Sequence, residues 1–375
     1  DDSLESYVYA FNAQGERVKE LTPWPAVALM WSIGQSGRRE KTLEKMFSSH
    51  LTTDWGVRVL SDRSRLYGPL NYNYGAVWPF ITGFVVAAQF NHHFLPQALP
   101  LLLAQAHHFF DNCLGHATEV FSGSRYLWPE EAVPHQGFSA TGFVLPLIRG
   151  LFGLDFSFSE NLIKFSPQFP ADWAEVKIRN IGFAREKINL DYMRKEGLVR
   201  LKINQVEKEI EPESRKQNED THAIVAGSKP LSFLYAPVFG PGIKVKEAKV
   251  NGQLVEFEFE ASPRASKVKI EVPLKEKILI ELYLEEMVEI LPPFPLSQPG
   301  DEDKGLKILN IENRGKGTRI VVEGREGEIY HLKLYRPDLV ASVNGAELVK
   351  DNLKIVFPAS PGDSFLKKEI MINLK

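Results

Sequence analysis

The amino-acid sequence changes character near residues 167–173, and this change constrains the fold more than any other feature. All six tryptophans and seven of the nine histidines lie within the first 173 residues. The remainder is rich in Lys, Glu, Val and Ile, with apolar and polar residues in alternation. At ~150 residues per domain the length allows two or three domains. We therefore expect an α-helical domain over residues 1–172 and an antiparallel β-sandwich region over residues 173–375.

Several segments of the first half have the length and apolar spacing of helices. Two long loops rich in Gly, Tyr, Asn and Trp separate them, at residues 52–74 and 115–136. Loops of this length in a compact helical domain are either functional or disordered, and the aromatic content argues against disorder. The predicted helices cover residues 25–35, 38–51, 76–90, 96–113 and 138–152.

In the second half the apolar residues recur with a period of two. This pattern predicts half-buried strands at residues 176–180, 199–203 and 268–272. Residues 207–220 are highly charged, and we expect them to form a solvated excursion. Residues 291–304 are rich in Pro, Gly and Asp, which is typical of a linker or long loop. They divide the β region into two parts.

Composition excludes several classes of function. The net charge of −3 gives no electrostatic case for nucleic-acid binding, and no stretch reaches the ~18 apolar residues of a membrane helix. The single Cys113 rules out an internal disulfide and a multi-cysteine zinc site. Neighbouring histidines on a helix point in different directions, so His92-His93 predicts no metal site. The compartment stays open.

The N-terminus gives two further expectations. Its first six residues are acidic and polar, so they do not form a signal peptide. The sequence also lacks an initiator methionine, so we expect a chain that begins after processing or a piece of a longer protein.

The most suggestive carboxylate is Glu119. It lies between small residues and a Phe-Ser-Gly turn, just after a predicted helix, and Tyr126 and Trp128 follow closely. Aromatic rings stack on pyranose faces, and a carboxylate can act as a general base on water, so the pattern is typical of a sugar-cleaving site. The alternative is an ordinary solvated glutamate on a surface loop.

A second candidate surface covers residues 66–80, which contain three tyrosines, two asparagines and a tryptophan. Such a polar and aromatic surface suits a ligand that has many hydroxyl groups and an apolar face. The alternative is an amphipathic loop packed on the helical core. Upstream, Asp54 and Arg58 supply another carboxylate and a guanidinium, or else a purely structural pair.

Four motifs occur in a recognisable order. They are Asp54-Trp-Gly-Val-Arg58, Tyr74-Gly-Ala-Val-Trp-Pro79, Glu119-Val-Phe-Ser-Gly123 and Pro134-His-Gln-Gly-Phe-Ser-Ala140. In this order they resemble the C-terminal part of the (α/α)6-toroid glycosidases, among them the amylo-α-1,6-glucosidase (debranching), processing α-glucosidase and trehalase groups. The resemblance covers about residues 1–185. It implies a multidomain fold, α then β, with a partial (α/α)6 helical toroid followed by an antiparallel β-sandwich.

The resemblance also implies an activity. It predicts an inverting glycoside hydrolase of the α-glucosidase or debranching type that acts on oligosaccharides, with Glu119 as the catalytic base. The residues that it places at the sugar are Trp78, Tyr74, Trp128, Asp54, Arg58 and Gln136. No cofactor is expected; related enzymes sometimes bind calcium, but this sequence does not support a calcium site.

The general acid of these relatives is missing from its expected position. It is an Asp well over a hundred residues upstream of the base, whereas Asp54 lies only 65 residues before Glu119. We therefore expect this chain to carry the catalytic-base half, and a second polypeptide or a missing N-terminal segment to complete the toroid. The alternatives are a non-catalytic carbohydrate-binding or scaffold protein, and an α-L-rhamnosidase-type or phosphorylase activity on the same fold.

Overall fold

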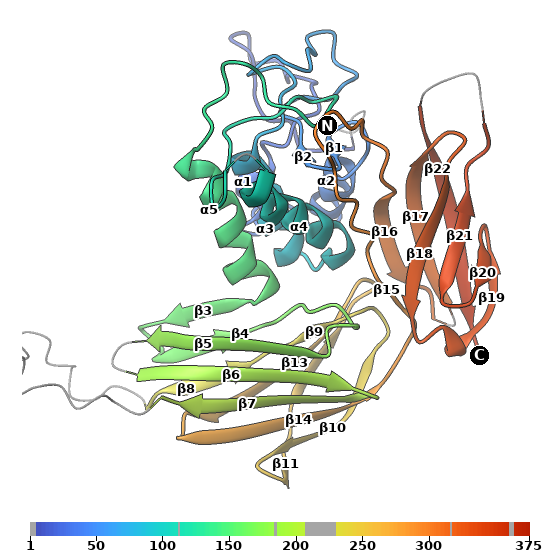
Figure 1. The fold of residues 1–375 in the computed structure, drawn as a ribbon. Helices are drawn as coiled ribbons and strands as arrows, with labels where there is room; N and C mark the ends of the chain where they lie inside the picture. Colours follow the sequence, from blue (N-terminus) through green and yellow to red (C-terminus); the bar gives the residue numbers. More distant parts are fainter. Residues whose placement is uncertain (1–4, 112, 184–185, 207–229, 316, 360–363) are drawn as a thin grey trace, which may run out of the picture. The chain divides into compact units, whose positions relative to one another are not determined.

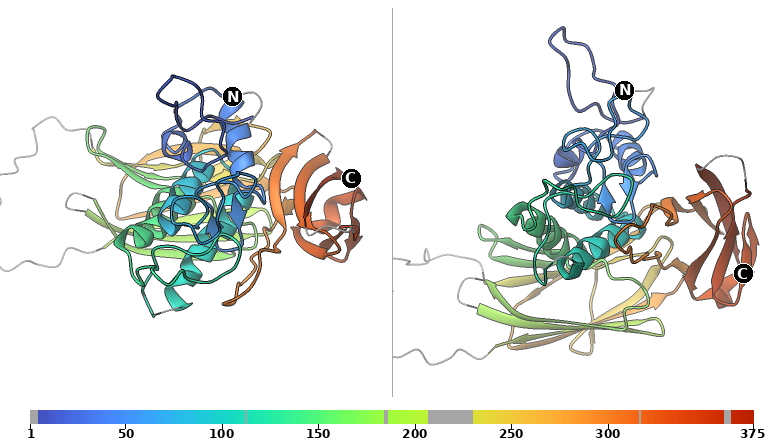
Figure 2. Two further views of the ribbon diagram at one scale, coloured as in Figure 1. Left: turned by 90° about the horizontal axis from the view of Figure 1, so that it is seen from above. Right: turned by 45° about the horizontal axis from the view of Figure 1, so that its top comes forward.

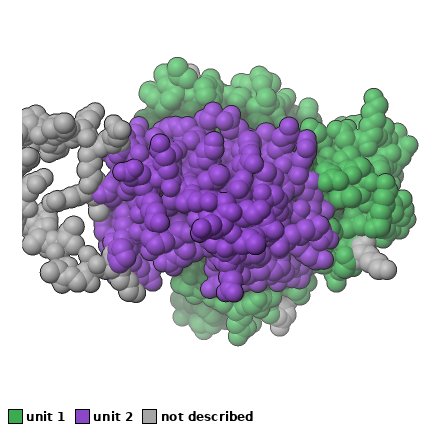
Figure 3. Space-filling view, turned by 90° about the horizontal axis from the view of Figure 1, so that it is seen from below, with its two compact units in different colours: residues 1–152, 287–375 green, residues 153–286 purple. Residues whose placement is uncertain are grey.

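A computed structural model of the chain divides into two compact units, residues 1–152 with 287–375, and residues 153–286 (Figure 3). The predicted charged excursion at residues 207–220 lies outside the described residues. The structure describes residues 5–111, 113–183, 186–206, 230–315, 317–359 and 364–375.

In the described residues, the first unit begins with five α-helices, each of which overlaps a segment predicted to be helical (Figure 1). Helix α3 begins at Pro79, where the fixed φ angle of proline suits the first helical position. Helix α5 continues directly into a π-helix, Pro146–Leu151. The α-helices are α1 (Ala26–Leu29), α2 (Arg38–Met46), α3 (Pro79–Asn91), α4 (Leu95–Asp111) and α5 (Gly137–Leu145).

The expected partial (α/α)6 toroid is wrong. Helix α3 is mostly buried and contacts α1, α2, α4 and α5, so a helix occupies the place where a toroid has its central cavity. The described part of the chain also contains more strand than helix. The physical reason lies in the aromatic loops, which form extended segments joined by backbone hydrogen bonds and add no helical hairpins to a ring.

Two glycines allow α3 and α5 to pack very closely. A Cβ atom added to Gly83 would lie 2.4 Å from the Cα atom of Gly142, a distance that real side chains do not reach. The two backbones therefore touch at this crossing, which sets how closely α5 packs on α3.

Residues 287–375 of the first unit form a β-sandwich of two four-stranded antiparallel sheets. Its strands are drawn in orange and red in Figures 1 and 2, and its interior is a cluster of aliphatic residues that includes Ile308, Ile320 and Leu332. One sheet has the order β15 (Glu289–Ile290), β18 (Ile329–Tyr335), β21 (Asn352–Val356), β20 (Glu347–Val349). The other has the order β16 (Lys307–Asn313), β17 (Gly317–Arg325), β22 (Phe365–Leu374), β19 (Val340–Asn344).

The second unit contains two six-stranded sheets, in which β4 and β8 pair in parallel. The strands predicted at residues 176–180, 199–203 and 268–272 lie within β5, β7 and β13. One sheet has the order β11 (Gln253–Leu254), β10 (Lys244–Val250), β14 (Lys277–Glu285), β7 (Leu198–Gln205), β6 (Glu186–Lys195), β5 (Glu175–Phe183). The other has β12 (Glu258–Ala261), β13 (Ser266–Pro273), β8 (Ser232–Tyr235), β4 (Leu162–Phe165), β3 (Leu154–Ser157), with β9 (Val238–Phe239) paired to β13.

The Pro-rich residues 291–304 form a long loop that is tied to the aromatic loops of the same unit. The backbone N–H of Tyr126 donates to the carbonyl oxygen of Asp301 at 2.8 Å, and the N–H of Gly300 donates back to the carbonyl oxygen of Tyr126 at 2.8 Å. The loop therefore helps to hold the segment that follows Glu119.

Candidate active site

Backbone pairing brings three of the four sequence motifs together. Val77 forms isolated antiparallel bridges with Arg58 on one side and with Phe121 on the other. The N–H groups of Val77 and Phe121 each donate to the carbonyl oxygen of the other at 2.8 Å. Segments that are far apart in the sequence thus lie side by side, and Trp78 and Glu119 follow and precede the paired residues.

The fourth motif lies along the strand-like segment that carries Glu119. The N–H of Glu119 donates to the carbonyl oxygen of Val133 at 3.0 Å, and the N–H of Gln136 donates to the carbonyl oxygen of Ala117 at 2.8 Å. These bonds place the first residues of α5 beside Glu119. They also explain why Gln136, seventeen positions further along the chain, reaches its carboxylate.

Neutral donors hold the Glu119 carboxylate, which is only 8% exposed. Its Oε1 atom accepts hydrogen bonds from the hydroxyl of Tyr72 at 2.8 Å and from Nε2 of Gln136 at 3.4 Å. Among the described residues, its Oε2 atom accepts only from the N–H of Val133, at 3.5 Å. Glu119 makes no ion pair with any residue that the structure describes.

Tyr72 is a site residue that the sequence analysis missed. Its ring packs edge-on against Trp78 with centroids 4.4 Å apart, and the indole N–H of Trp78 donates to the carbonyl oxygen of Tyr72 at 3.0 Å. Burial and the hydrogen bond to Glu119 raise the pKa of Tyr72, so its hydroxyl stays protonated as a donor. The signal was the run Asn71-Tyr72-Asn73-Tyr74, in which sequence alone does not show which tyrosine faces the carboxylate.

The other predicted aromatic residues have different environments. Tyr74 is 46% exposed on the same loop as Tyr72, and its side chain makes no hydrogen bond to a described residue. Trp128 packs against a buried cluster that includes Trp55 and Phe121. Tyr74 is therefore accessible to a ligand. Trp128 mainly packs against the buried cluster and so stabilises the loops.

Asp54 does not contact Glu119 in the structure. Its Oδ1 atom accepts from Nζ of Lys307 at 2.5 Å, and its Oδ2 atom accepts from the backbone N–H groups of Lys304 at 3.0 Å and Gly305 at 2.8 Å. Burial raises the pKa of Asp54, but the Lys307 ammonium and the two N–H donors outweigh burial and lower it overall. Asp54 is thus a buried anion with a permanent counter-ion.

The side chain of Arg58 is also buried, and it also forms hydrogen bonds within the protein. Its Nε atom donates to the carbonyl oxygen of Gly123 at 2.5 Å and its Nη1 atom to that of Ser49 at 2.7 Å. Its Nη2 atom lies 3.8 Å from Oδ2 of Asp303, and Oδ1 of the same aspartate accepts from Nζ of Lys307 at 2.7 Å. The side chains of Asp54 and Arg58 therefore belong to one ion cluster, defined as Asp54, Arg58, Asp303 and Lys307.

Within the described ranges, no group of three or more His, Cys, Asp and Glu side chains is placed to hold a metal ion. No helix of the described part is long and apolar enough to span a bilayer.

Comparisons with known proteins do not identify a family for this chain. No protein-family model matches the sequence, and no curated protein matches it. Among solved structures, the chain is similar to a GH127 β-L-arabinofuranosidase from Geobacillus stearothermophilus T6, with a TM-score of 0.32, 10% identity, and coverage of 93% of this chain and 57% of that chain. It is also similar to a protein described as a glycoside hydrolase, with a TM-score of 0.36, 11% identity, and coverage of 98% and 64%.

This chain thus spans less than two thirds of the length of either glycoside hydrolase. TM-scores of 0.32 and 0.36 do not establish a common fold, so neither likeness bears on the site.

Proposed function

We propose that the loops around Glu119 form part of a glycoside hydrolase active site, in which Glu119 is the general base. The substrate class is an oligosaccharide. The observation that carries the proposal is a nearly buried carboxylate held by neutral donors, next to the half-exposed tyrosines Tyr72 and Tyr74. A carboxylate without a counter-ion keeps the capacity to accept a proton, and aromatic faces beside it suit a sugar ring.

The two carboxylate oxygens of Glu119 have separate tasks in this proposal. Oε1 is anchored by the Tyr72 hydroxyl at 2.8 Å, which fixes the orientation of the carboxylate. Oε2 has a single, long contact at 3.5 Å, so its lone pairs can accept a hydrogen bond from a water molecule. Tyr72 is thus a positioning residue, and Oε2 is the atom that takes the proton.

The chemistry is a single inverting displacement. As Oε2 of Glu119 removes a proton from water, the water oxygen bonds to the anomeric carbon and the bond from that carbon to the leaving oxygen breaks. A general acid donates a proton to the leaving oxygen in the same step. The products are a sugar of inverted configuration and an alcohol, and the two carboxyl groups exchange protonation states.

We also propose that the general acid comes from outside this sequence, either from a second polypeptide or from a further segment of a longer chain. Asp111, whose side chain is 9% exposed, accepts a hydrogen bond from the Tyr126 hydroxyl and lies 3.2 Å from Nε2 of His107. Asp54 and Asp303 are also buried aspartates of this unit, and both accept hydrogen bonds from Lys307 inside the ion cluster. At that position neither can reach a glycosidic oxygen. The complete enzyme, with any associated polypeptide retained, is therefore the form to assay.

The decisive experiment compares Glu119→Gln with Glu131→Gln, a matched change at an exposed glutamate of the same loop region. Hydrolysis of α-glucosides and α-L-rhamnosides is followed by NMR, which reports the anomeric configuration of the first product. We expect Glu119→Gln to lose nearly all turnover with oligosaccharide binding preserved, and Glu131→Gln to keep both. Full turnover in Glu119→Gln, or a product of retained configuration, overturns the assignment.

Chemical rescue also tests whether Glu119 is the general base, by restoring activity to a variant that lacks its carboxylate. In Glu119→Ala, azide can enter the space of the missing carboxylate and attack the anomeric carbon without a base. We expect azide to restore cleavage and to produce a glycosyl azide of inverted configuration. Azide has no such effect if Glu119 only supports the loop.

A non-catalytic carbohydrate-binding protein is the rival reading, and one observation favours it. The Tyr72 hydroxyl already donates a hydrogen bond to Oε1 of Glu119. A carboxylate that is oriented in this way can simply accept hydrogen bonds from sugar hydroxyls, without acting as a base. Calorimetry of oligosaccharide binding, next to prolonged incubation with the same sugar, separates the two. Binding without any product in the complete assembly supports this rival.

A further inference from the structure

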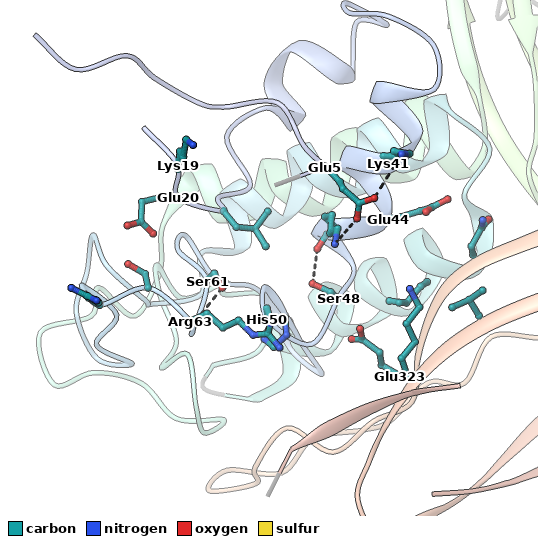
Figure 4. Close-up of a pocket in the computed structure, with 18 of the residues that line it drawn as sticks. Glu5, Lys19, Glu20, Lys41, Glu44, Ser48, His50, Ser61, Arg63 and Glu323 are labelled. Atoms are coloured by element: carbon teal, nitrogen blue, oxygen red, sulfur yellow. Dashed lines mark hydrogen bonds and ion pairs between the residues drawn. The ribbon is translucent and has the colours of Figure 1, made fainter. Parts of the chain in front are cut away.

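We propose that a second pocket of the first unit binds an anionic saccharide, that is, a sugar that carries a carboxylate or phosphate group. The pocket has a volume of about 740 Å³, and it lies between α2, residues 61–65 and the strands β16, β17 and β22 (Figure 4). Ligand sites generally measure roughly 300–1,000 Å³. None of the residues predicted to serve the Glu119 site lines it, so the proposal is independent of that function.

The pocket lining contains the glutamates Glu5, Glu20, Glu44 and Glu323, and two of them have clear partners within the protein. Glu5 lies 3.0 Å from Nζ of Lys45 and 3.7 Å from Nζ of Lys41. Glu323 accepts a hydrogen bond from the backbone N–H of Ser49 at 2.8 Å. Glu5 and Glu323 are therefore largely satisfied within the protein, whereas Glu20 forms no ion pair with a residue that the structure describes.

Four basic side chains of the lining lack such partners. Lys19, Arg63, Arg65 and Lys367 line the pocket, and none of them forms an ion pair with a residue that the structure describes. Figure 4 shows Lys19 and Arg63 on different sides of the hollow. Guanidinium groups match carboxylate and phosphate geometry with two parallel hydrogen bonds, so this excess of unpaired positive charge selects an anion.

Asn310 indicates the second feature of the ligand. It is 6% exposed, and its Nδ2 atom donates to Oε1 of Glu312 at 2.8 Å, which fixes the orientation of the amide. Its Oδ1 atom is buried without a hydrogen-bond partner in the described part of the chain. Buried acceptors are normally satisfied, so a donor is missing here, and a sugar hydroxyl is such a donor.

The lining also explains why charge, and not ring stacking, selects the ligand. No Phe, Tyr or Trp occurs among the described residues that line this pocket. A neutral oligosaccharide would therefore find no aromatic face, in contrast to the loops around Glu119. An acidic sugar supplies both the anion for the basic groups and the hydroxyl for Asn310.

Isothermal titration calorimetry on the intact protein tests the proposal with three probes: digalacturonate, glucose 6-phosphate and neutral maltose. We expect at least one acidic probe to bind, with an affinity that falls at higher salt, and maltose to show no binding at this pocket. The carboxylate and phosphate probes distinguish which acidic group the pocket prefers. The variant Arg63→Ala/Arg65→Ala should weaken acidic-sugar binding about tenfold or more.

Two controls keep the test specific. Lys202→Ala/Lys277→Ala removes two positive charges from strands β7 and β14 of the second unit and should leave binding unchanged. Lys367→Ala, which alters the pocket from β22, should weaken binding several-fold. The proposal is overturned if neither acidic probe binds, if the pocket variants weaken maltose binding as much as acidic-sugar binding, or if both pocket variants bind the acidic probes normally while folded by circular dichroism.

Discussion

Glu119 and Asp54 are two buried carboxylates of the same unit, yet their surroundings are opposite. Glu119 is held by a tyrosine hydroxyl, an amide and one backbone N–H, next to exposed aromatic side chains. Asp54 is held by an ammonium group and two backbone N–H donors at 2.5–3.0 Å. A carboxylate with a permanent cation beside it is committed to structure, whereas one held by neutral donors can still accept a proton.

The ion cluster around Asp54 has a structural consequence that Glu119 lacks. Lys307 bonds to both Asp54 and Asp303, so it joins the start of β16 to the loop that carries Arg58. Removing several charges from water is costly, and mutual attraction offsets that cost only when every partner is present. The cluster therefore makes the unit sensitive to the loss of any one member.

The largest expected effect is a loss of activity when Glu119 is changed, whereas a change of Asp54 should lower stability instead. We expect Glu119→Gln to lower kcat by roughly 10²- to 10⁴-fold, the usual contribution of a general base. Its urea midpoint should hardly move, because an amide fits the same neutral donors. Asp54→Asn should do the reverse, with a lower urea midpoint. If both variants lost kcat to a similar extent and were equally stable, Glu119 and Asp54 would not have the different roles assigned to them here.

The next effect concerns the centre of the ion cluster. Lys307→Met leaves Asp54 and Asp303 as buried carboxylates without their ammonium, and breaking a buried ion pair in this way typically costs about 3–5 kcal/mol. The free energy of unfolding from urea titration measures it. Lys304→Met, at an exposed neighbouring lysine, is the matched control. An equal change in both variants would mean that the cluster contributes nothing of its own.

A smaller effect appears as a pH dependence of stability. Burial, opposed by Lys307 and Arg58 and reinforced by Asp54, raises the pKa of Asp303 to about 7. The folded state then holds this proton where the unfolded state, with a pKa of about 3.9, releases it. Stability contributed by protonated Asp303 is full below pH ~4 and is lost as the pH rises towards 7.

Urea midpoints measured between pH 4.5 and 8 check this slope, and Asp303→Asn should flatten it. Asp54 acts in a different window, because its lowered pKa gives stability that is lost only as the pH falls below about 4. A slope that survives in Asp303→Asn would assign the titration to another group.

The smallest effect tests the role of Tyr72. Tyr72→Phe removes one hydrogen bond to Glu119, and a bond of this kind contributes about 0.5–1.5 kcal/mol, so kcat should fall about threefold to tenfold. The KM should stay close to its original value. Tyr74→Phe is the control, and an equal fall of kcat in both variants would exclude a specific role for Tyr72.

Sequence patterns predicted the local elements well and the assembly poorly. Apolar spacing located α2 to α5, and period-two alternation located strands such as β5, β7 and β13. The toroid was wrong because the motif order says nothing about how helices pack, and here they surround α3. The resemblance placed Gln136 near Glu119, and its amide lies 3.4 Å from Oε1.

The sequence by itself therefore determined where helices, strands and aromatic loops form, because these depend on residues a few positions apart. It also singled out Glu119, whose supporting segment lies close in the chain. Only the tertiary structure decided that Tyr72 faces this carboxylate and that Asp54 meets Lys307, a residue 253 positions away. Burial and charge pairing depend on which distant segments meet, and this assigns one carboxylate to a candidate site and the other to the core.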